Sequence, residues 1–408
     1  MLPQLGLWTQ RLIQCVTPFA ELKVLAPIPS APPRVLARFA PYYERYRAAA
    51  PSRWDGPVEV LHPRFLTGPG QSLYAVETAS YLAAALPYVM RLRARFRFDL
   101  IHAHFTYPDG VAAVALGRLF RVPVVITEHV LWLPWMNDQP VVRRQAAWAA
   151  RECAAHLAVS HSVRQHIGQV TGRPDRVHVV PNVVDGSVFT PAAGRHPAPR
   201  QILFVGAVRV SKGVDVLLET LALLRRRGAD VRLTLVGEPY YRAYQREAER
   251  LRDLAEALGV TEFIDMLGGR PPAEVARLMA ESAVVVLPSR RESFGAVLIE
   301  ALACGTPVVA TRCGGPEEIV MPEVGKLVAP EDPAGLADAL FDVLEDAHAY
   351  DPQALREYAL TRFGPATIGQ QIATRYDVAY RDGTSLSATT ATKRGRKTKR
   401  SGYHEHAR

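Results

Sequence analysis

Short apolar, β-branched segments alternate with longer helical patterns through most of this chain, and no other feature restricts its fold as strongly. Strands that read as continuous apolar runs are buried on both faces, as parallel strands covered by helices are. The alternation therefore predicts parallel sheets built from β–α–β units. The clearest expected strands span residues 98–105, 122–129, 156–160, 177–182, 201–208, 231–238, 282–289 and 306–313.

The length of 408 residues suits two domains better than one core. Residues 190–200 (TPAAGRHPAPR) are rich in Pro, Ala and Gly and show no periodicity, which is typical of a linker. We expect two doubly wound, Rossmann-like α/β domains that face each other across a cleft, with a ligand at the carboxyl ends of the strands. The expected divisions are one α/β domain at 1–190, a linker at 191–200, a second α/β domain at 201–362, a helix returning toward the first domain at 363–382, and a tail at 383–408.

The first domain opens in an unusual way. A doubly wound domain usually begins with an apolar strand and a glycine-rich turn, whereas here a helix-like stretch at 7–19 precedes the first strand at 22–27. An open position in the middle of a sheet would leave buried backbone groups unpaired. Either irregular structure supplies the opening strand, or the true start of the chain lies upstream of Met1, and the sequence favours the second alternative.

The net charge of +9 is concentrated at the C-terminus. From Gly383 onward seven Lys or Arg residues stand against one acidic residue, so the tail carries +6 and the remainder about +3. The folded part is therefore not a strongly basic nucleic-acid binder. The tail lacks apolar residues to bury, so we expect it to be disordered and solvated, with contact to anionic lipid or nucleic acid as the alternative.

The composition also bears on the compartment. No apolar run reaches the roughly 18 residues needed to span a bilayer. Arg11 interrupts the only early apolar stretch, which argues against a signal peptide. The four cysteines lie far apart and without metal-ligand spacing. We expect a cytoplasmic protein with reduced cysteines.

The most informative segment is 288–311 (PSRRESFGAVLIEALACGTPVVAT), where a strand, a loop and a helix follow one another. Glu292 and Glu300 would lie within roughly 80° of each other if one helix held both. Glu292 would stand at the helix N-terminus, where the backbone N–H groups of Phe294 and Gly295 attract an anion. Two carboxylates there suit the hydroxyl groups of a sugar and a ribose. The alternative is that Glu292 favours the helix dipole and Glu300 is solvated.

A second pattern follows the strand at 201–208: a glycine, Gly206, then Arg209, Lys212 and Gly213 in a short turn before a helix. Two cations at a helix N-terminus are unfavourable unless an anion lies between them, and a diphosphate would satisfy both. The spacing fits neither the dinucleotide fingerprint nor the phosphate-binding loop of nucleotide triphosphatases. The alternative is a pair of surface cations in an exposed turn.

These two segments together resemble the retaining glycosyltransferases of family 4, which have the GT-B fold. Further phrases in matching order extend the resemblance over most of the chain from residue 98. They are IHAHFTYPDG at 101–110, TEH at 127–129, AVSHS at 158–162, VVPNVVD at 179–185 and CGGPEEIV at 313–320. The resemblance implies a nucleotide-sugar donor bound by the second domain and an acceptor, a sugar or a lipid, on the side of the first.

The resemblance also implies roles for the charged residues. Glu292 would bind the hydroxyl groups of the donor sugar, and Glu300 those of the ribose. Lys212 would bind the diphosphate, with Arg209 beside it. The family usually has Arg directly after the glycine, where this chain has Ala207. Backbone amides would contact the sugar and the phosphate at Ser293, Phe294 and Gly295.

Further positions follow from the same resemblance. Gly206 would let the backbone approach the phosphates closely. The loop at 266–268, with Gly268, would flank the base. His129 would face the reacting carbon from the first domain, whereas His102 and His104 read as structural.

The reaction implied by the resemblance is attack by an acceptor hydroxyl on the face from which the nucleotide leaves, with no metal and no cofactor required. The alternatives are a nucleotide-sugar 2-epimerase of the same fold, and an inactive, truncated sugar-nucleotide binder. The basic, aromatic segments at 42–47 and 91–97 are candidates for peripheral contact with an anionic membrane, against ordinary cationic helix faces. No specific nucleic-acid partner is expected.

Overall fold

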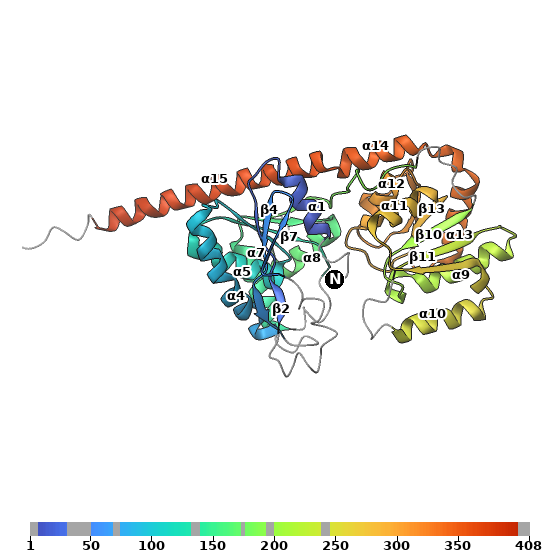
Figure 1. The fold of residues 1–408 in the computed structure, drawn as a ribbon, viewed down its shortest axis with the longest axis horizontal. Coiled ribbons are helices and arrows are strands. Elements are labelled where there is room, and N and C mark those ends of the chain that lie inside the picture. The colour runs from blue at the N-terminus through green and yellow to red at the C-terminus, as the bar shows by residue number, and fades with distance from the viewer. Residues whose placement is uncertain are drawn as a thin grey trace, which may run out of the picture.

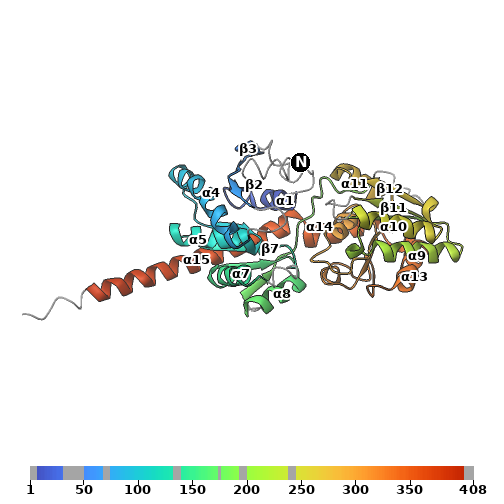
Figure 2. The same cartoon turned by 90° about the horizontal axis from the view of Figure 1, so that it is seen from below.

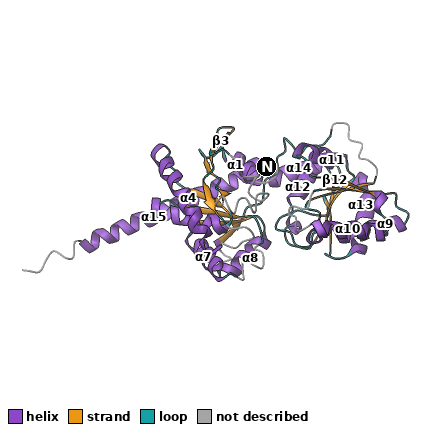
Figure 3. Cartoon of the chain, turned by 60° about the horizontal axis from the view of Figure 1, so that its bottom comes forward, coloured by secondary structure: helices purple, strands orange, loops and turns teal. Residues whose placement is uncertain are grey.

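The computed structural model describes residues 7–30, 50–67, 74–131, 139–172, 176–192, 200–237 and 245–398. They form two α/β domains side by side, with the last two helices running along both (Figure 1). In each domain helices surround the strands (Figure 3). The fold class predicted from the sequence is confirmed, because both main sheets are parallel and helices connect their strands.

The second domain is built on six parallel strands in the order β12-β11-β10-β13-β14-β15. Numbered from β10, this is the doubly wound order 3-2-1-4-5-6, whose direction reverses between β10 and β13. A ligand is expected beyond the carboxyl ends of these two strands. The strands are β10 (Gln201–Val205), β11 (Arg232–Val236), β12 (Ile264–Gly268), β13 (Val284–Leu287), β14 (Val308–Thr311) and β15 (Gly325–Val328).

Apolar helix faces cover both sides of this sheet. One core joins Leu217, Leu251 and Leu340 to strand residues such as Phe204. Its helices are α9 (Val214–Arg226), α10 (Gln245–Ala257) and α13 (Pro333–Glu345). The core on the other face is formed by α11 (Pro272–Glu281), α12 (Ala296–Ala303) and α14 (Pro352–Phe363). Complete coverage explains why β13 and β14 are buried at every position and apolar at all but Thr311.

The first domain has its strands in separate sheets. Four parallel strands follow the order β6-β7-β8-β9, whereas β1, β4 and β3 form another sheet and β2 pairs with β5. Among the described residues no strand joins β1 to β6. The strands are β1 (Lys23–Leu25), β2 (Ile28–Ser30), β3 (Ser52–Asp55), β4 (Val58–Leu61), β5 (Arg64–Leu66), β6 (Ile101–His104), β7 (Val124–Glu128), β8 (Ala155–Ala158) and β9 (Val177–Val179).

Helices α4 (Tyr74–Arg95), α5 (Val111–Phe120), α7 (Pro140–Glu152) and α8 (His161–Thr171) complete the first domain. The predicted helix before the first strand is α1 (Leu7–Val16). The buried side chains of Leu12 and Val16 on α1 pack with Ile368 and Ile372 of the C-terminal helix α15 (Pro365–Thr398). Helix α15 therefore leaves the second domain and returns to the first (Figure 1).

Helix α15 is longer than the sequence suggested. It continues beyond the first domain as far as Thr398 (Figure 2). The prediction of a disordered tail from residue 383 is therefore wrong for 383–398. Extending a helix that is already anchored requires only propagation and no new nucleus, and no proline interrupts this segment. Residues 399–408 lie outside the described residues, as do 193–199 of the expected linker and the segment 42–47.

None of the described helices is both long enough and apolar enough to cross a membrane.

Candidate active site

The turn after β10 and the loop after β13 meet at the point where the strand order reverses. There the Lys212 Nζ atom lies 2.5 Å from the Glu292 Oε2 atom, and both side chains are half-buried. The turn fits closely because Gly213 has a φ of +69° and a Cβ atom at this position would lie 1.9 Å from the carbonyl oxygen of Pro288. Only glycine satisfies both conditions without distortion. The structure thus brings together a predicted cation and a predicted carboxylate 80 residues apart in sequence.

Glu292 lies in a loop and not in a helix. Helix α12 begins at Ala296, so the estimate that placed both glutamates on one helix face does not apply. The backbone of Glu292 is fixed instead by Cys313 and Gly315: its N–H donates to the Cys313 oxygen (3.2 Å), and its oxygen accepts from the Gly315 N–H (2.9 Å). The loop ends at Gly295, whose φ of +92° turns the chain into α12 without a side-chain cap. Amides in the first turn of such a helix lack helical acceptors.

Glu300 is buried and its partner comes from the other domain. The Glu300 Oε1 atom lies 2.6 Å from Nη1 of Arg11, a residue of α1. The Arg11 guanidinium also lies over the Phe189 ring, 5.1 Å from its centroid. Burial raises the pKa of the Glu300 carboxyl, and Arg11 opposes that shift. The alternative of a solvated Glu300 is therefore wrong, and Arg11 is a residue that sequence reasoning did not associate with the site.

His129 directly follows β7 and is half-buried. Its Nδ1 atom lies 3.3 Å from Asn182 Oδ1, and its Nε2 atom lies 2.9 Å from Nδ1 of His104. Burial lowers the pKa of His129 to about 4, so its imidazole is neutral near pH 7. A neutral ring can exchange one of these two contacts for a hydrogen bond to a ligand without adding charge.

The carboxylate of Glu128 organises the backbone around His129. It is buried, and it accepts the N–H groups of His129 (3.1 Å), Val130 (3.3 Å) and Thr106 (3.0 Å). A carboxylate at the end of a fully buried strand was the sequence signal for this role. His102 has a structural role. Its ring lies 2.7 Å from both the Tyr376 hydroxyl and the Thr127 hydroxyl, so it links α15 to β7.

The two domains touch each other beside these residues. The Leu131 N–H donates to Ser293 Oγ at 3.0 Å, and the Ser160 hydroxyl donates to the Ser293 carbonyl oxygen at 2.6 Å. Ser293 follows Glu292, and Leu131 lies two residues after His129, so these bonds bring the predicted residues of both domains to one cleft. Phe294 is buried with its ring against Phe363, which leaves only its backbone for a ligand.

Glycines mark the carboxyl ends of three neighbouring strands. Gly206 follows β10, Gly237 follows β11 and Gly268 ends β12. The Gly237 N–H donates to the Gly268 oxygen at 3.0 Å, and a Cβ atom on Gly237 would lie 1.8 Å from the Gly206 oxygen. Gly237 is thus a missed member of this group. Arg209 is half-buried and its carbonyl oxygen accepts the Lys212 N–H at 3.0 Å, so it belongs to the same turn.

In the described part of the chain, no three His, Cys, Asp or Glu side chains converge as metal ligands would. The independence from metal implied by the resemblance stays a prediction.

Comparison with known proteins agrees with this geometry. Residues 190–362 match the family described as Glycosyl transferases group 1, and residues 35–188 match the one described as Glycosyltransferase Family 4. The D-inositol 3-phosphate glycosyltransferase of Pseudarthrobacter chlorophenolicus is 33% identical over 307 residues, which cover 69% of this chain and 71% of that protein. The enzyme of the same name from Paenarthrobacter aurescens is 32% identical over 320 residues, covering 71% and 76%.

Solved structures share the fold. Sucrose-phosphate synthase from Thermosynechococcus elongatus superposes with a TM-score of 0.68 at 21% identity, covering 81% of this chain and 86% of that one. Anabaena HepE in complex with UDP and glucose superposes with a TM-score of 0.67 at 21% identity, covering 92% of this chain and 96% of that one. These structures show the GT-B fold, and the family matches show that the chain is a glycosyltransferase. Within that class, the chain belongs to glycosyltransferase family 4.

Proposed function

We propose that this glycosyltransferase moves a hexosyl unit from a UDP- or GDP-sugar to a hydroxyl group of a glycan, lipid-linked or small-molecule acceptor. It does so with retention of the anomeric configuration, in polysaccharide or glycolipid biosynthesis. The observation that carries the proposal is the half-buried ion pair of Lys212 with Glu292 where the strand order reverses. One donor can give each member of the pair a new partner, because its diphosphate suits Lys212 and its sugar hydroxyls suit Glu292.

The reaction follows from what these groups can hold. A bond forms between the acceptor oxygen and the anomeric carbon while the bond from that carbon to the diphosphate oxygen breaks. The acceptor proton passes to the departing phosphate oxygen. Lys212, Arg209 and the first amides of α12 stabilise the charge on the leaving group. His129, neutral because of burial, binds the sugar on the opposite side of the cleft.

The donor and the acceptor have different degrees of support. Anabaena HepE has been solved with UDP and with UDP-glucose, which favours a uridine donor. The curated relatives are named for D-inositol 3-phosphate, which makes a phosphorylated cyclitol the first acceptor to test. Peripheral membrane contact through the end of α4, where Arg91, Arg93 and Arg95 lie, stays part of the proposal and is tested by binding to anionic vesicles.

The decisive experiment has two parts. Thermal unfolding is first measured with a panel of UDP- and GDP-sugars, because a ligand that binds only the folded state raises the midpoint. The stabilising donor is then incubated with and without D-inositol 3-phosphate, and the products and their anomeric configuration are determined by NMR. A retained glycoside supports the proposal. Conversion of the donor to its 2-epimer without acceptor, or no binding of any donor, contradicts it.

A further inference from the structure

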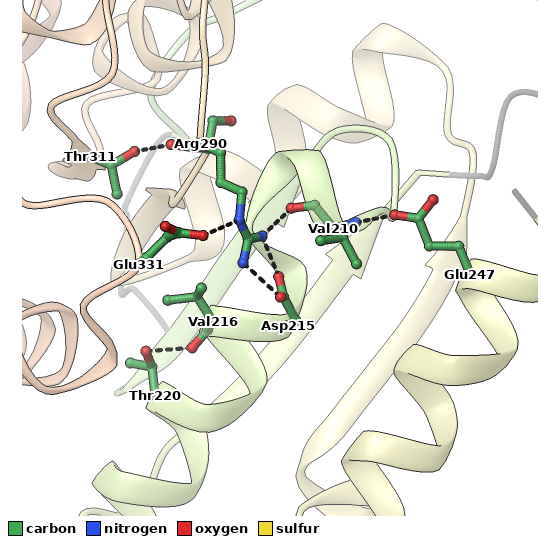
Figure 4. A network of polar contacts seen from close by, with 9 residues as sticks. Val210, Asp215, Val216, Thr220, Glu247, Arg290, Thr311 and Glu331 are labelled. Atoms are coloured by element: carbon green, nitrogen blue, oxygen red, sulfur yellow. Dashed lines mark hydrogen bonds and ion pairs between the residues drawn. The ribbon is translucent and has the colours of Figure 1, made fainter.

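Arg290 stands between the loop that carries Glu292 and the turn that carries Lys212. Its guanidinium makes a fork to Asp215, with Nη1 2.7 Å from Oδ1 and Nη2 2.8 Å from Oδ2 (Figure 4). The Nε atom lies 2.8 Å from Glu331 Oε1, and Nη1 also donates to the Val210 carbonyl oxygen. A planar fork of this kind fixes the geometry of both partners, which a lysine cannot do.

The main chain reinforces this contact. The Arg290 N–H donates to the Ser211 oxygen at 3.2 Å, so backbone and side chain both hold the single 3-10 turn η4 (Val210–Lys212). On its other side the Val210 N–H donates to Glu247 of α10 (Figure 4). The turn that ends in Lys212 is thus held from two directions. Four of the five guanidinium N–H groups of Arg290 donate to protein oxygens, which leaves little capacity for a substrate.

We propose that Arg290 is a positioning residue for the donor diphosphate, acting through Lys212. By holding η4 against the loop after β13, it keeps the Lys212 Nζ atom beside Glu292. It also neutralises Asp215, a carboxylate three residues from Lys212 that would otherwise compete with the diphosphate for that cation. This inference rests on the proposed donor site and adds a residue to it that binds no part of the donor.

The test compares two ligands that differ only in the diphosphate. The affinity of the full chain for UDP and for uridine is measured by calorimetry, or for GDP and guanosine if the wild type prefers guanine. Arg290→Gln is expected to weaken UDP binding by about tenfold, within the range of coupling between neighbouring charged groups. Uridine binding should stay within about twofold, because Arg290 acts on the phosphate end alone. Equal losses for both ligands would show general damage to the domain and overturn the inference.

A double-mutant cycle then asks whether Arg290 acts through Lys212. If it does, Arg290→Gln combined with Lys212→Ala binds UDP no more weakly than Lys212→Ala alone, because the group to be positioned is already missing. A further loss of about tenfold in the double variant would mean that Arg290 acts on UDP by another route, and would overturn the inference.

The matched control is Arg227→Gln. Arg227 follows the opposite end of α9 and pairs with Asp338 at 2.5 Å, so the change removes one ion pair from the same helix, away from the cleft. It should leave UDP affinity unchanged. If Arg290→Gln does not fold, Arg290→Lys replaces it, with the same expected loss for UDP and none for uridine. Wild-type protein that binds neither UDP nor GDP would overturn the proposed function itself, whereas unchanged UDP binding in the Arg290 variants would overturn only this inference.

Discussion

At the scale of single residues, Lys212 and Glu292 form an ion pair between the turn after β10 and the loop after β13. Their side chains are 22% and 15% exposed, so solvent screens the pair less than a surface pair, and neither charge is without a partner before the donor arrives. When the donor binds, Lys212 and Glu292 exchange each other for groups of the donor. No charge has to be buried without a partner in this exchange. We therefore expect turnover to depend more on Lys212 than on any other residue of the proposed site.

We predict that Lys212→Ala lowers kcat by about 10²-fold, because it removes a cation that stabilises the leaving diphosphate in the transition state. Steady-state kinetics with the donor and acceptor identified by NMR provide the measurement. Lys326→Ala serves as the control, since Lys326 lies on the edge strand β15 and pairs there with Asp342. Near-normal turnover in Lys212→Ala would remove this lysine from the mechanism.

Glu300 gives a different kinetic expectation. If it binds the ribose equally in the ground state and the transition state, Glu300→Gln should raise the KM for the donor and leave kcat largely unchanged. The measurement is the same steady-state analysis, with the donor varied at saturating acceptor. An unchanged KM would contradict the ribose assignment, and a fall in kcat alone would give Glu300 a role in the chemical step.

At the scale of elements, the sequence predicted most of the strands and few of their ends. The strand expected at 201–208 is β10, which stops at Val205, and the one expected at 282–289 is β13, which stops at Leu287. After β10 the buried side chain of Val208 continues the apolar pattern past the ladder, whereas Pro288 and Ser289 follow β13 in a loop. Strand β12 was not expected, since Asp265 and the glycines after it hide its short apolar pattern.

The charged contacts of the site could be predicted only in part. Motif spacing placed Lys212 and Glu292 in one site, because both follow strands whose carboxyl ends meet. No local pattern links Arg11 to Glu300, which are 289 residues apart, or Arg290 to Asp215, which are 75 apart. Such pairs depend on how α1 and α9 dock, and helix docking is a tertiary property that periodicity does not encode.

The contact of Arg11 on α1 with Glu300 affects how the nucleoside of the donor binds. Arg11 holds the carboxylate that the resemblance assigns to the ribose, so a nucleoside must displace it. We predict that Arg11→Gln strengthens uridine binding severalfold, because the cost of releasing Glu300 disappears. The same variant should unfold at lower temperature, since it leaves a buried carboxylate without its partner.

Calorimetry with uridine measures this effect. Glu300→Gln is the matched comparison and should weaken uridine binding. Weaker uridine binding by Arg11→Gln would instead make Arg11 part of the donor site.

At the scale of the whole molecule, α15 joins the two domains. It begins one residue after α14, where the Val184 N–H donates to the Phe363 oxygen at 2.9 Å, and it packs along the first domain through Ile368 and Ile372. Farther along, the Tyr376 hydroxyl contacts His102, which in turn contacts Thr127 on β7. The returning helix thus contacts His102 of the first domain, and the stability of that domain should depend on the protonation of its histidines.

Burial lowers the pKa of His102 to about 3 and that of both His129 and His156 to about 4. In the unfolded chain a histidine titrates near 6.5, so between these values the unfolded state binds more protons than the folded one. The free energy of unfolding therefore falls as the pH drops below about 6.5, by about 1.4 kcal/mol for each pH unit and each histidine. Above that pH these histidines leave it constant. The contribution of Asp109 to the free energy of unfolding has the opposite sign. Burial raises the pKa of Asp109 to about 6, so protonation of this carboxyl stabilises the folded state at low pH.

Histidines with a lowered pKa outnumber carboxyls with a raised pKa among the described residues, so acidification gives a net loss of stability. We predict that the unfolding midpoint, measured by circular dichroism, falls between about pH 7.5 and about pH 5. His156→Gln should make that fall shallower, because His156 is buried on β8 against the Thr106 hydroxyl and lies outside the donor site. His348→Gln is the control, since His348 is exposed in the second domain and its loss should leave the slope unchanged. Parallel pH profiles for the wild type and His156→Gln would show that protons are taken up elsewhere and would contradict the assignment.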